Sequence, residues 1–186
     1  MRKAYLHIVP ECFVDTNLVQ LLMQVKGVNH QYSCGQVTNT MQRRFGDAFS
    51  VGIVDNDKRQ SKYAQACQEI AHSQEIILCK HPDSHHYLVK IVNVMETFIM
   101  HCIEELGLSL EALEIPNGIE DLKQFTKDQD SLDNPQLQRI LKAVAPAKEM
   151  MLLKEVLEYL DSTRYQASET VLRGIFDKFS TKNLVV

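Results

Sequence analysis

The fold is read most directly from Phe49-Ser50-Val51-Gly52-Ile53-Val54-Asp55-Asn56-Asp57, a short apolar run that ends in two aspartates. Side chains two positions apart in an extended segment point to the same side, so Asp55 and Asp57 would converge at the end of a strand. Two carboxylates held that close repel each other unless a hard divalent cation such as Mg²⁺ lies between them. The pair therefore predicts a cation site, with an Asx turn that closes the strand as the alternative.

The composition is that of an ordinary globular chain. Of 186 residues, 45% are apolar and 24% charged, which fits one compact domain or a domain with a smaller appendage. The net charge of −4 provides no general basic surface for nucleic acid. The apolar stretch near the N-terminus is short and is interrupted by His7 and Pro10, so it resembles neither a signal peptide nor a membrane span. We expect a cytoplasmic protein without membrane contact.

Cysteine and histidine residues offer two other metal hypotheses. The five cysteines are scattered and contain no CxxC spacing, which favours buried free thiols over disulfides or structural zinc. His81, His85 and His86 lie with Asp83 between two strand-like runs and would suit zinc. A polar loop with Pro82 accounts for the same residues without a metal.

Extended and helical runs alternate along the first part of the chain. Extended runs are expected at residues 4–9, 28–34, 49–57, 75–80 and 87–92, and helices follow at about 15–26, 36–45, 58–73 and 94–106. This alternation predicts an α/β domain over residues 1–107, with a mainly parallel sheet flanked by helices.

Polar residues or glycine follow each of the first three expected strands. Glu11 comes after the first, Gly35 after the second, and the Asp55/Asp57 pair ends the third. Because ligands of parallel sheets bind outside the carboxyl ends of the strands, we expect these residues to share one edge. This arrangement strengthens the cation hypothesis.

Residues 108–186 are expected to form a helical C-terminal extension. Apolar stripes with helical spacing recur there, and one of them comprises Met150, Leu153, Val156, Leu157 and Leu160. Because an apolar surface of this size is rarely left exposed to solvent, the stripes should pack against the α/β layer, a second copy of the chain or a partner protein.

The order of these motifs resembles the Toprim fold, a Rossmann-like domain shared by topoisomerases, bacterial primases, and small and OLD-like nucleases. That family places a glutamate after its first strand, a glycine at the turn after its second and a DxD motif after its third. Glu11, Gly35 and Asp55-Asn56-Asp57 match these positions. OLD-like members also carry a glutamate early in a later helix, where Glu96 stands here. The resemblance covers residues 4–106.

The resemblance implies a nuclease, a hydrolase that cleaves phosphodiester bonds in nucleic acid with Mg²⁺ or Mn²⁺. Asp55 and Asp57 would be the principal metal ligands. Glu11 would be a further ligand or the general base, and Glu96 would complete an outer shell or a second metal site. Five basic residues would contact phosphate, or else form a solvated helix face: Arg43, Arg44, Lys58, Arg59 and Lys62.

The chain also departs from the family pattern. Cys12-Phe13 stands where a small residue commonly follows the glutamate, and Lys58-Arg59 replaces a further acid after the DxD. These changes leave open one metal ion or two, and a non-enzymatic Toprim-like subunit that docks through its helical tail. A glycosyltransferase with a DxD motif, and a phosphatase or receiver domain that uses Lys90, are further alternatives. The sequence does not choose between DNA and RNA.

Overall fold

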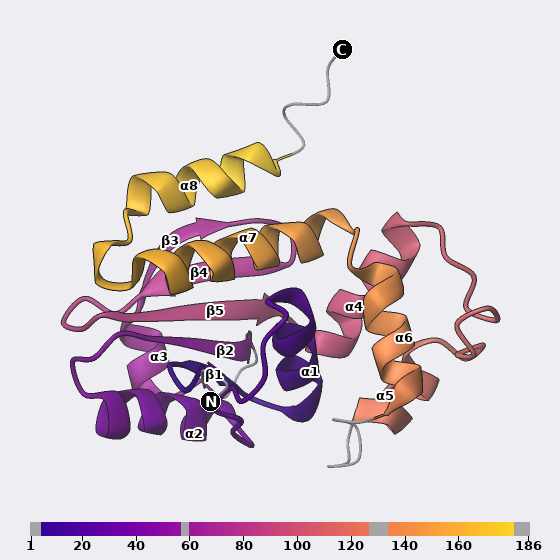
Figure 1. The fold of residues 1–186 in the computed structure, drawn as a ribbon, viewed down its shortest axis with the longest axis horizontal. Helices are drawn as coiled ribbons and strands as arrows, with labels where there is room; N and C mark the ends of the chain where they lie inside the picture. Colours follow the sequence, from indigo (N-terminus) through magenta and orange to yellow (C-terminus); the bar gives the residue numbers. More distant parts are fainter. Residues whose placement is uncertain (1–4, 57–59, 127–133, 181–186) are drawn as a thin grey trace.

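The computed structural model describes residues 5–56, 60–126 and 134–180, which build a five-stranded sheet with helices on both faces (Figure 1). The strand order is β1 (Ile8–Pro10), β2 (Ser50–Asn56), β5 (His86–Val92), β4 (Ile76–Lys80) and β3 (Gln68–His72). The pairings β1–β2 and β2–β5 are parallel, whereas β5–β4 and β4–β3 are antiparallel. The α/β architecture is confirmed, but the mainly parallel sheet is corrected to a mixed one. The connection between β4 and β5 is too short for the crossover that a parallel pair requires.

The helix expected over residues 58–73 is wrong. A short helix, α3 (Lys62–Ala66), forms there instead. Its N-cap Ser61 accepts a hydrogen bond from the backbone N–H of Ala64 at 3.1 Å. Strand β3 follows at the edge of the sheet, with Ile70 buried between exposed Glu69 and half-buried Ala71. Ile70 is the only buried residue of β3, so the strand lacks the alternation of apolar and polar residues that distinguishes a strand from a helix in the sequence.

The first helix begins earlier than expected. Helix α1 (Phe13–Leu22) starts directly after β1, because Cys12 is its N-cap and the Asp15 side chain accepts a hydrogen bond from the Cys12 backbone at 3.1 Å. Residues 28–34 do not form a regular strand. They run beside β1, where the Asn29 N–H donates to the Ile8 carbonyl at 2.9 Å and the Gln31 N–H donates to the Pro10 carbonyl at 3.0 Å. The chain then enters α2 (Cys34–Thr40) and one π-helical turn, η1 (Met41–Phe45).

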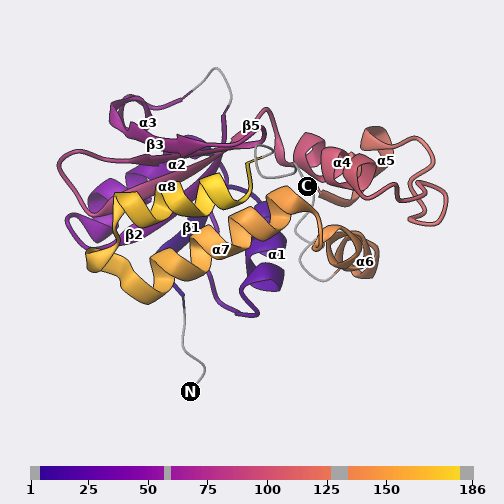
Figure 2. The same ribbon diagram turned by 90° about the horizontal axis from the view of Figure 1, so that it is seen from above.

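Each face of the sheet has its own hydrophobic cluster. Helices α1, α4 (Met95–Glu105), α7 (Lys148–Thr163) and α8 (Glu169–Lys178) belong to the cluster on one face, and α2, η1 and α3 belong to the cluster on the other. Figure 2 shows α7 and α3 on opposite sides of the sheet. The second cluster packs tightly on β2, since a Cβ added at Gly52 would lie 2.6 Å from Leu88 Cδ2 and 2.7 Å from Met41 Sδ.

The C-terminal part of the chain is helical, as expected. It comprises α5 (Ile119–Thr126), α6 (Pro135–Val144), α7, the short η3 (Arg164–Gln166) and α8. All five residues of the α7 stripe are buried against the α/β layer, namely Met150, Leu153, Val156, Leu157 and Leu160. The stripe is therefore covered by the chain itself. Within the described ranges, no helix has the length and apolar composition needed to cross a bilayer.

Candidate functional site

Glu11 and Asp55 meet at the carboxyl ends of two neighbouring parallel strands. Glu11 directly follows β1, and its backbone N–H donates to the Ile53 carbonyl at 3.0 Å. Its Oε2 atom accepts a hydrogen bond from the backbone N–H of Asp55 at 3.1 Å. In turn, Asp55 Oδ1 accepts from the backbone N–H of Met95, the first residue of α4, at 3.1 Å. Backbone donors thus hold both carboxylates, which limits how far either side chain can move.

Asp15 is a third carboxylate at this edge that the motif pattern did not single out. It is 1% exposed, and its Oδ1 atom is buried without a hydrogen-bond partner. Burial raises the pKa of Asp15 well above its usual range, and the nearby charges of Asp55 and Glu11 raise it further. Its spacing from Glu11, one helical turn after the end of a strand, is the signal that would have found it.

The remaining acidic and turn residues have mixed placements. Asp57 lies outside the described residues. Glu96 follows Met95 in the first turn of α4, and its Oε1 atom accepts a hydrogen bond from the Thr126 hydroxyl at 2.6 Å. Gly35 is the second residue of α2 and lies inside the helix, so the expected turn role is corrected. Only Ser33 Oγ, at 3.9 Å, lies near a Cβ added at Gly35, so neither space nor backbone angle requires glycine there.

Of the predicted basic residues that the structure describes, Arg43 and Arg44 lie away from the acidic edge and Lys62 lies near it. Arg43 and Arg44 are exposed in η1, which leads into the start of β2, at the edge opposite Asp55. Lys62 begins α3 close to the end of β2, since Gln60 donates a hydrogen bond to Asn56 at 2.5 Å. Lys58 and Arg59 lie outside the described residues.

Lys90 does not support the phosphatase or receiver alternative. It pairs with Val54 in the sheet, so its side chain leaves the face opposite to that of Asp55. Its ammonium group is used within the second cluster, where it donates to Gln60 Oε1 at 3.0 Å and to the Ala64 carbonyl at 3.1 Å. Lys90 therefore anchors α3.

Of the residues in the zinc hypothesis, His86 is used in packing, and the cysteines are free thiols. His86 is fully buried, with Nδ1 at 2.5 Å from the Tyr63 hydroxyl and Nε2 at 3.0 Å from the Ala48 carbonyl. Both ring nitrogens are engaged, so neither is available to a zinc ion. All five cysteines are free thiols, and burial raises the pKa of Cys67 and of Cys102 to about 12. These thiols stay protonated at neutral pH.

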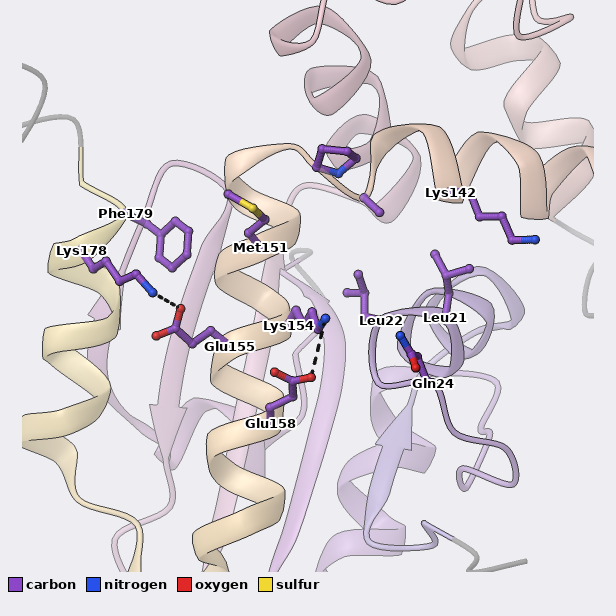
Figure 3. A pocket seen from close by; sticks show the side chains of 12 residues that line it. Leu21, Leu22, Gln24, Lys142, Met151, Lys154, Glu155, Glu158, Lys178 and Phe179 are labelled. Carbon is purple, nitrogen blue, oxygen red and sulfur yellow. Dashed lines mark hydrogen bonds and ion pairs between the residues drawn. The ribbon is translucent and has the colours of Figure 1, made fainter.

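A groove of about 860 Å³ lies elsewhere, between the C-terminal end of α1, α7 and the end of α8 (Figure 3). Its floor is apolar, with Leu21, Met151 and Phe179 among the lining residues. Two ion pairs lie on its rim, where Lys178 is 2.6 Å from Glu155 and Lys154 is 3.8 Å from Glu158. None of the carboxylates of the acidic edge lines this groove.

The donor set of the acidic edge suits a hard cation, because carboxylate oxygens are the ligands that Mg²⁺ and Mn²⁺ prefer. The buried and unpartnered Asp15 Oδ1 atom beside Glu11 and Asp55 is consistent with that donor set. Among residues 5–56, 60–126 and 134–180, however, no group of three or more His, Cys, Asp or Glu side chains is arranged to hold a metal ion. The described part of the edge thus provides fewer than three preformed ligands.

Comparisons of the chain with protein-family models, with curated proteins and with solved structures found no match.

Proposed function

We propose that the protein is a metal-dependent phosphodiesterase of the Toprim type that acts on nucleic acid. The observation that carries the proposal is the contact of 3.1 Å between Glu11 Oε2 and the backbone N–H of Asp55. It brings two carboxylates from neighbouring parallel strands to the edge where ligands of such sheets bind. Like charges held together cost free energy, and a bound cation would compensate for that cost.

In the proposed reaction, Asp55 and Asp57 would hold Mg²⁺ or Mn²⁺, and Glu11 would be a further ligand or would take the proton of the attacking water. When bound, the cation would neutralise phosphate charge, lower the pKa of a water molecule and stabilise the leaving oxygen. Glu96 supports the outer part of the site, where its hydrogen bond to Thr126 ties α4 to α5. Lys62 is the basic residue best placed to meet phosphate.

The direct test is cleavage of labelled single-stranded and duplex DNA and RNA in Mg²⁺, Mn²⁺, Ca²⁺ or EDTA. Turnover is expected with Mg²⁺ or Mn²⁺ and little with Ca²⁺, which accepts looser geometry. Asp55→Asn should reduce turnover by about two orders of magnitude or more, because it removes a ligand charge and keeps an acceptor for the Met95 N–H.

Asp121→Asn is the matched control. Asp121 also accepts a backbone hydrogen bond, from Asn117 at 2.8 Å, but in α5. Its replacement should leave cleavage unchanged. Cleavage that survives in a protein carrying both Asp55→Asn and Glu11→Gln would come from a contaminating nuclease and would refute the proposal.

A non-enzymatic subunit with the same scaffold is the second candidate. The observation in its favour is that the described residues contain no preformed group of three metal ligands. The α7 stripe would not be its docking surface, because that stripe is buried inside the chain. Absence of any cation-dependent cleavage in a correctly folded protein would favour this candidate.

A further inference from the structure

Three aromatic rings cluster beside the acidic edge, and we call Phe13, His30 and Tyr32 the aromatic platform. The rings of Phe13 and His30 stack with centroids 4.2 Å apart and planes inclined by 17°. Tyr32 meets both at a steep angle, with its centroid 5.8 Å from Phe13 and 4.8 Å from His30. These are favourable geometries for aromatic pairs, so the cluster is ordered by its own packing.

The backbone fixes the aromatic platform next to Glu11. Gln31 donates its backbone N–H to the Pro10 carbonyl at 3.0 Å, which places Tyr32 beside the end of β1. Phe13 lies two residues after Glu11, and His30 Nδ1 lies 2.9 Å from the Thr16 hydroxyl of the same helix. Phe13 and His30 are half-buried, whereas Tyr32 is 69% exposed.

We propose that Tyr32, backed by Phe13 and His30, stacks against an unpaired base of a single-stranded nucleic acid whose backbone lies at the Glu11–Asp55 edge. This inference rests on the proposed function and names its substrate class. Aromatic side chains bind single strands by stacking on bases without strong sequence preference. Bases in a duplex have their faces covered, so the aromatic platform selects against paired substrates.

Charge at this edge also favours stacking as the source of affinity. The chain has a net charge of −4, and Arg43 and Arg44 lie at the opposite edge of the sheet. Phosphate contacts usually dominate nucleic-acid affinity, and of the predicted basic residues that the structure describes only Lys62 lies near this edge to supply them. Burial lowers the pKa of His30, so its ring is neutral at neutral pH and contributes a surface for packing rather than a charge.

The sequence contains no tryptophan, so a Tyr32→Trp variant carries a single fluorescent reporter in the aromatic platform. Its emission is followed while a short oligothymidylate, an oligouridylate, an abasic strand of equal length or a duplex is added in Ca²⁺. Quenching is expected with thymidylate, uridylate or both, and little with the abasic strand or the duplex. The preferred strand then distinguishes DNA from RNA.

Tyr165→Trp is the matched control, because Tyr165 is 58% exposed but lies at the start of β2, where its hydroxyl accepts a hydrogen bond from Phe49. Its emission should not change. In a binding assay with labelled strand, Tyr32→Ala should weaken affinity about tenfold, whereas Tyr32→Phe should retain it. Unchanged thermal unfolding of each variant shows that the fold is intact.

The outcomes separate this inference from the proposed function. Three results would overturn the proposal that Tyr32 stacks on a base: equal quenching by the abasic strand, equal quenching in Tyr165→Trp, or no quenching by any strand. If cleavage that depends on Asp55 persists in those cases, the nuclease proposal stands alone. Quenching by single strands without cation-dependent cleavage would support the aromatic platform and refute the nuclease.

Discussion

The Glu11–Asp55 edge and helix α7 differ in how their charges are placed: α7 pairs opposite charges on its surface, whereas the edge places like charges near each other. Helix α7 buries its apolar stripe and pairs charges on its outer side, where Lys154 lies 3.8 Å from Glu158. At the edge, burial raises the pKa of Asp15, and the nearby charges of Asp55 and Glu11 raise it further. The first arrangement stabilises a fold, whereas the second costs stability. Such local costs are usually retained where a protein binds or reacts.

The largest effect on stability is expected in the α7 stripe. Leu153→Ala removes a fully buried side chain and leaves a cavity, which should cost about 2–5 kcal/mol. For a chain of this length the melting temperature should fall by roughly 10 °C in a thermal unfolding scan. Met151→Ala on the same helix is the control, because Met151 is 45% exposed and should change stability little. Equal losses in both variants would contradict the division into a buried stripe and an open face.

Cation binding should stabilise the folded protein only when the carboxylates of the edge are intact. At a Mn²⁺ concentration about a hundredfold above the Kd, the folded state gains about 2.7 kcal/mol, visible as a rise in melting temperature. Asp55→Asn should abolish this rise while keeping the acceptor for the Met95 N–H, which Asp55→Ala would lose. Leu153→Ala should show the full rise from its lower baseline. A rise that persists in Asp55→Asn would place the cation elsewhere.

Gly52 tests how closely the second cluster packs on β2 beneath the edge. A Cβ there would meet Leu88, Met41 and Val37 at 2.6–2.9 Å, so Gly52→Ala should cost about 1–3 kcal/mol. Gly174→Ala is the matched control within α8, because a Cβ added there meets nothing within 4 Å. That change should stabilise the helix by about 0.5–1 kcal/mol. Chemical denaturation measures the change in the free energy of unfolding of each variant. A loss of stability in both variants would argue against the close approach at β2.

The smallest effect is the pH dependence of Glu149 in α7. Burial raises the pKa of this carboxyl, and Glu75 and Glu105 raise it further, whereas its hydrogen bond from Ser73 and the charge of Lys148 lower it. A carboxyl with a raised pKa binds its proton more tightly in the folded state. Its contribution to stability is therefore complete below the unfolded pKa and is lost as the pH rises through the folded value.

Glu149→Gln removes that titration and keeps an acceptor for the Ser73 hydroxyl, which lies 2.5 Å from Glu149 Oε2. The melting temperature of the variant relative to the natural protein should therefore rise from below pH 4.5 to neutral pH. A constant or falling difference would show that Glu149 is not the titrating group.

Several elements followed from local pattern alone. The run before Asp55 became β2, and the apolar runs after Glu75 and His86 became β4 and β5. The α7 stripe was identified from its spacing and is buried as expected. The edge that joins Glu11 and Asp55 followed from the rule for parallel strands, because both residues end strands of one sheet.

Other features depended on contacts between segments distant in the sequence. The antiparallel direction of β3 and β4, the engagement of Lys90 with α3 and the separation of Arg43 from Asp55 arise from how the chain folds back on itself. The burial of Asp15 and its proximity to two other carboxylates arise in the same way. Local sequence located the strands and helices whose periodicity is strong, because periodicity is a property of neighbours. Which charges meet, and at what cost, is decided only when the sheet brings the ends of its strands together.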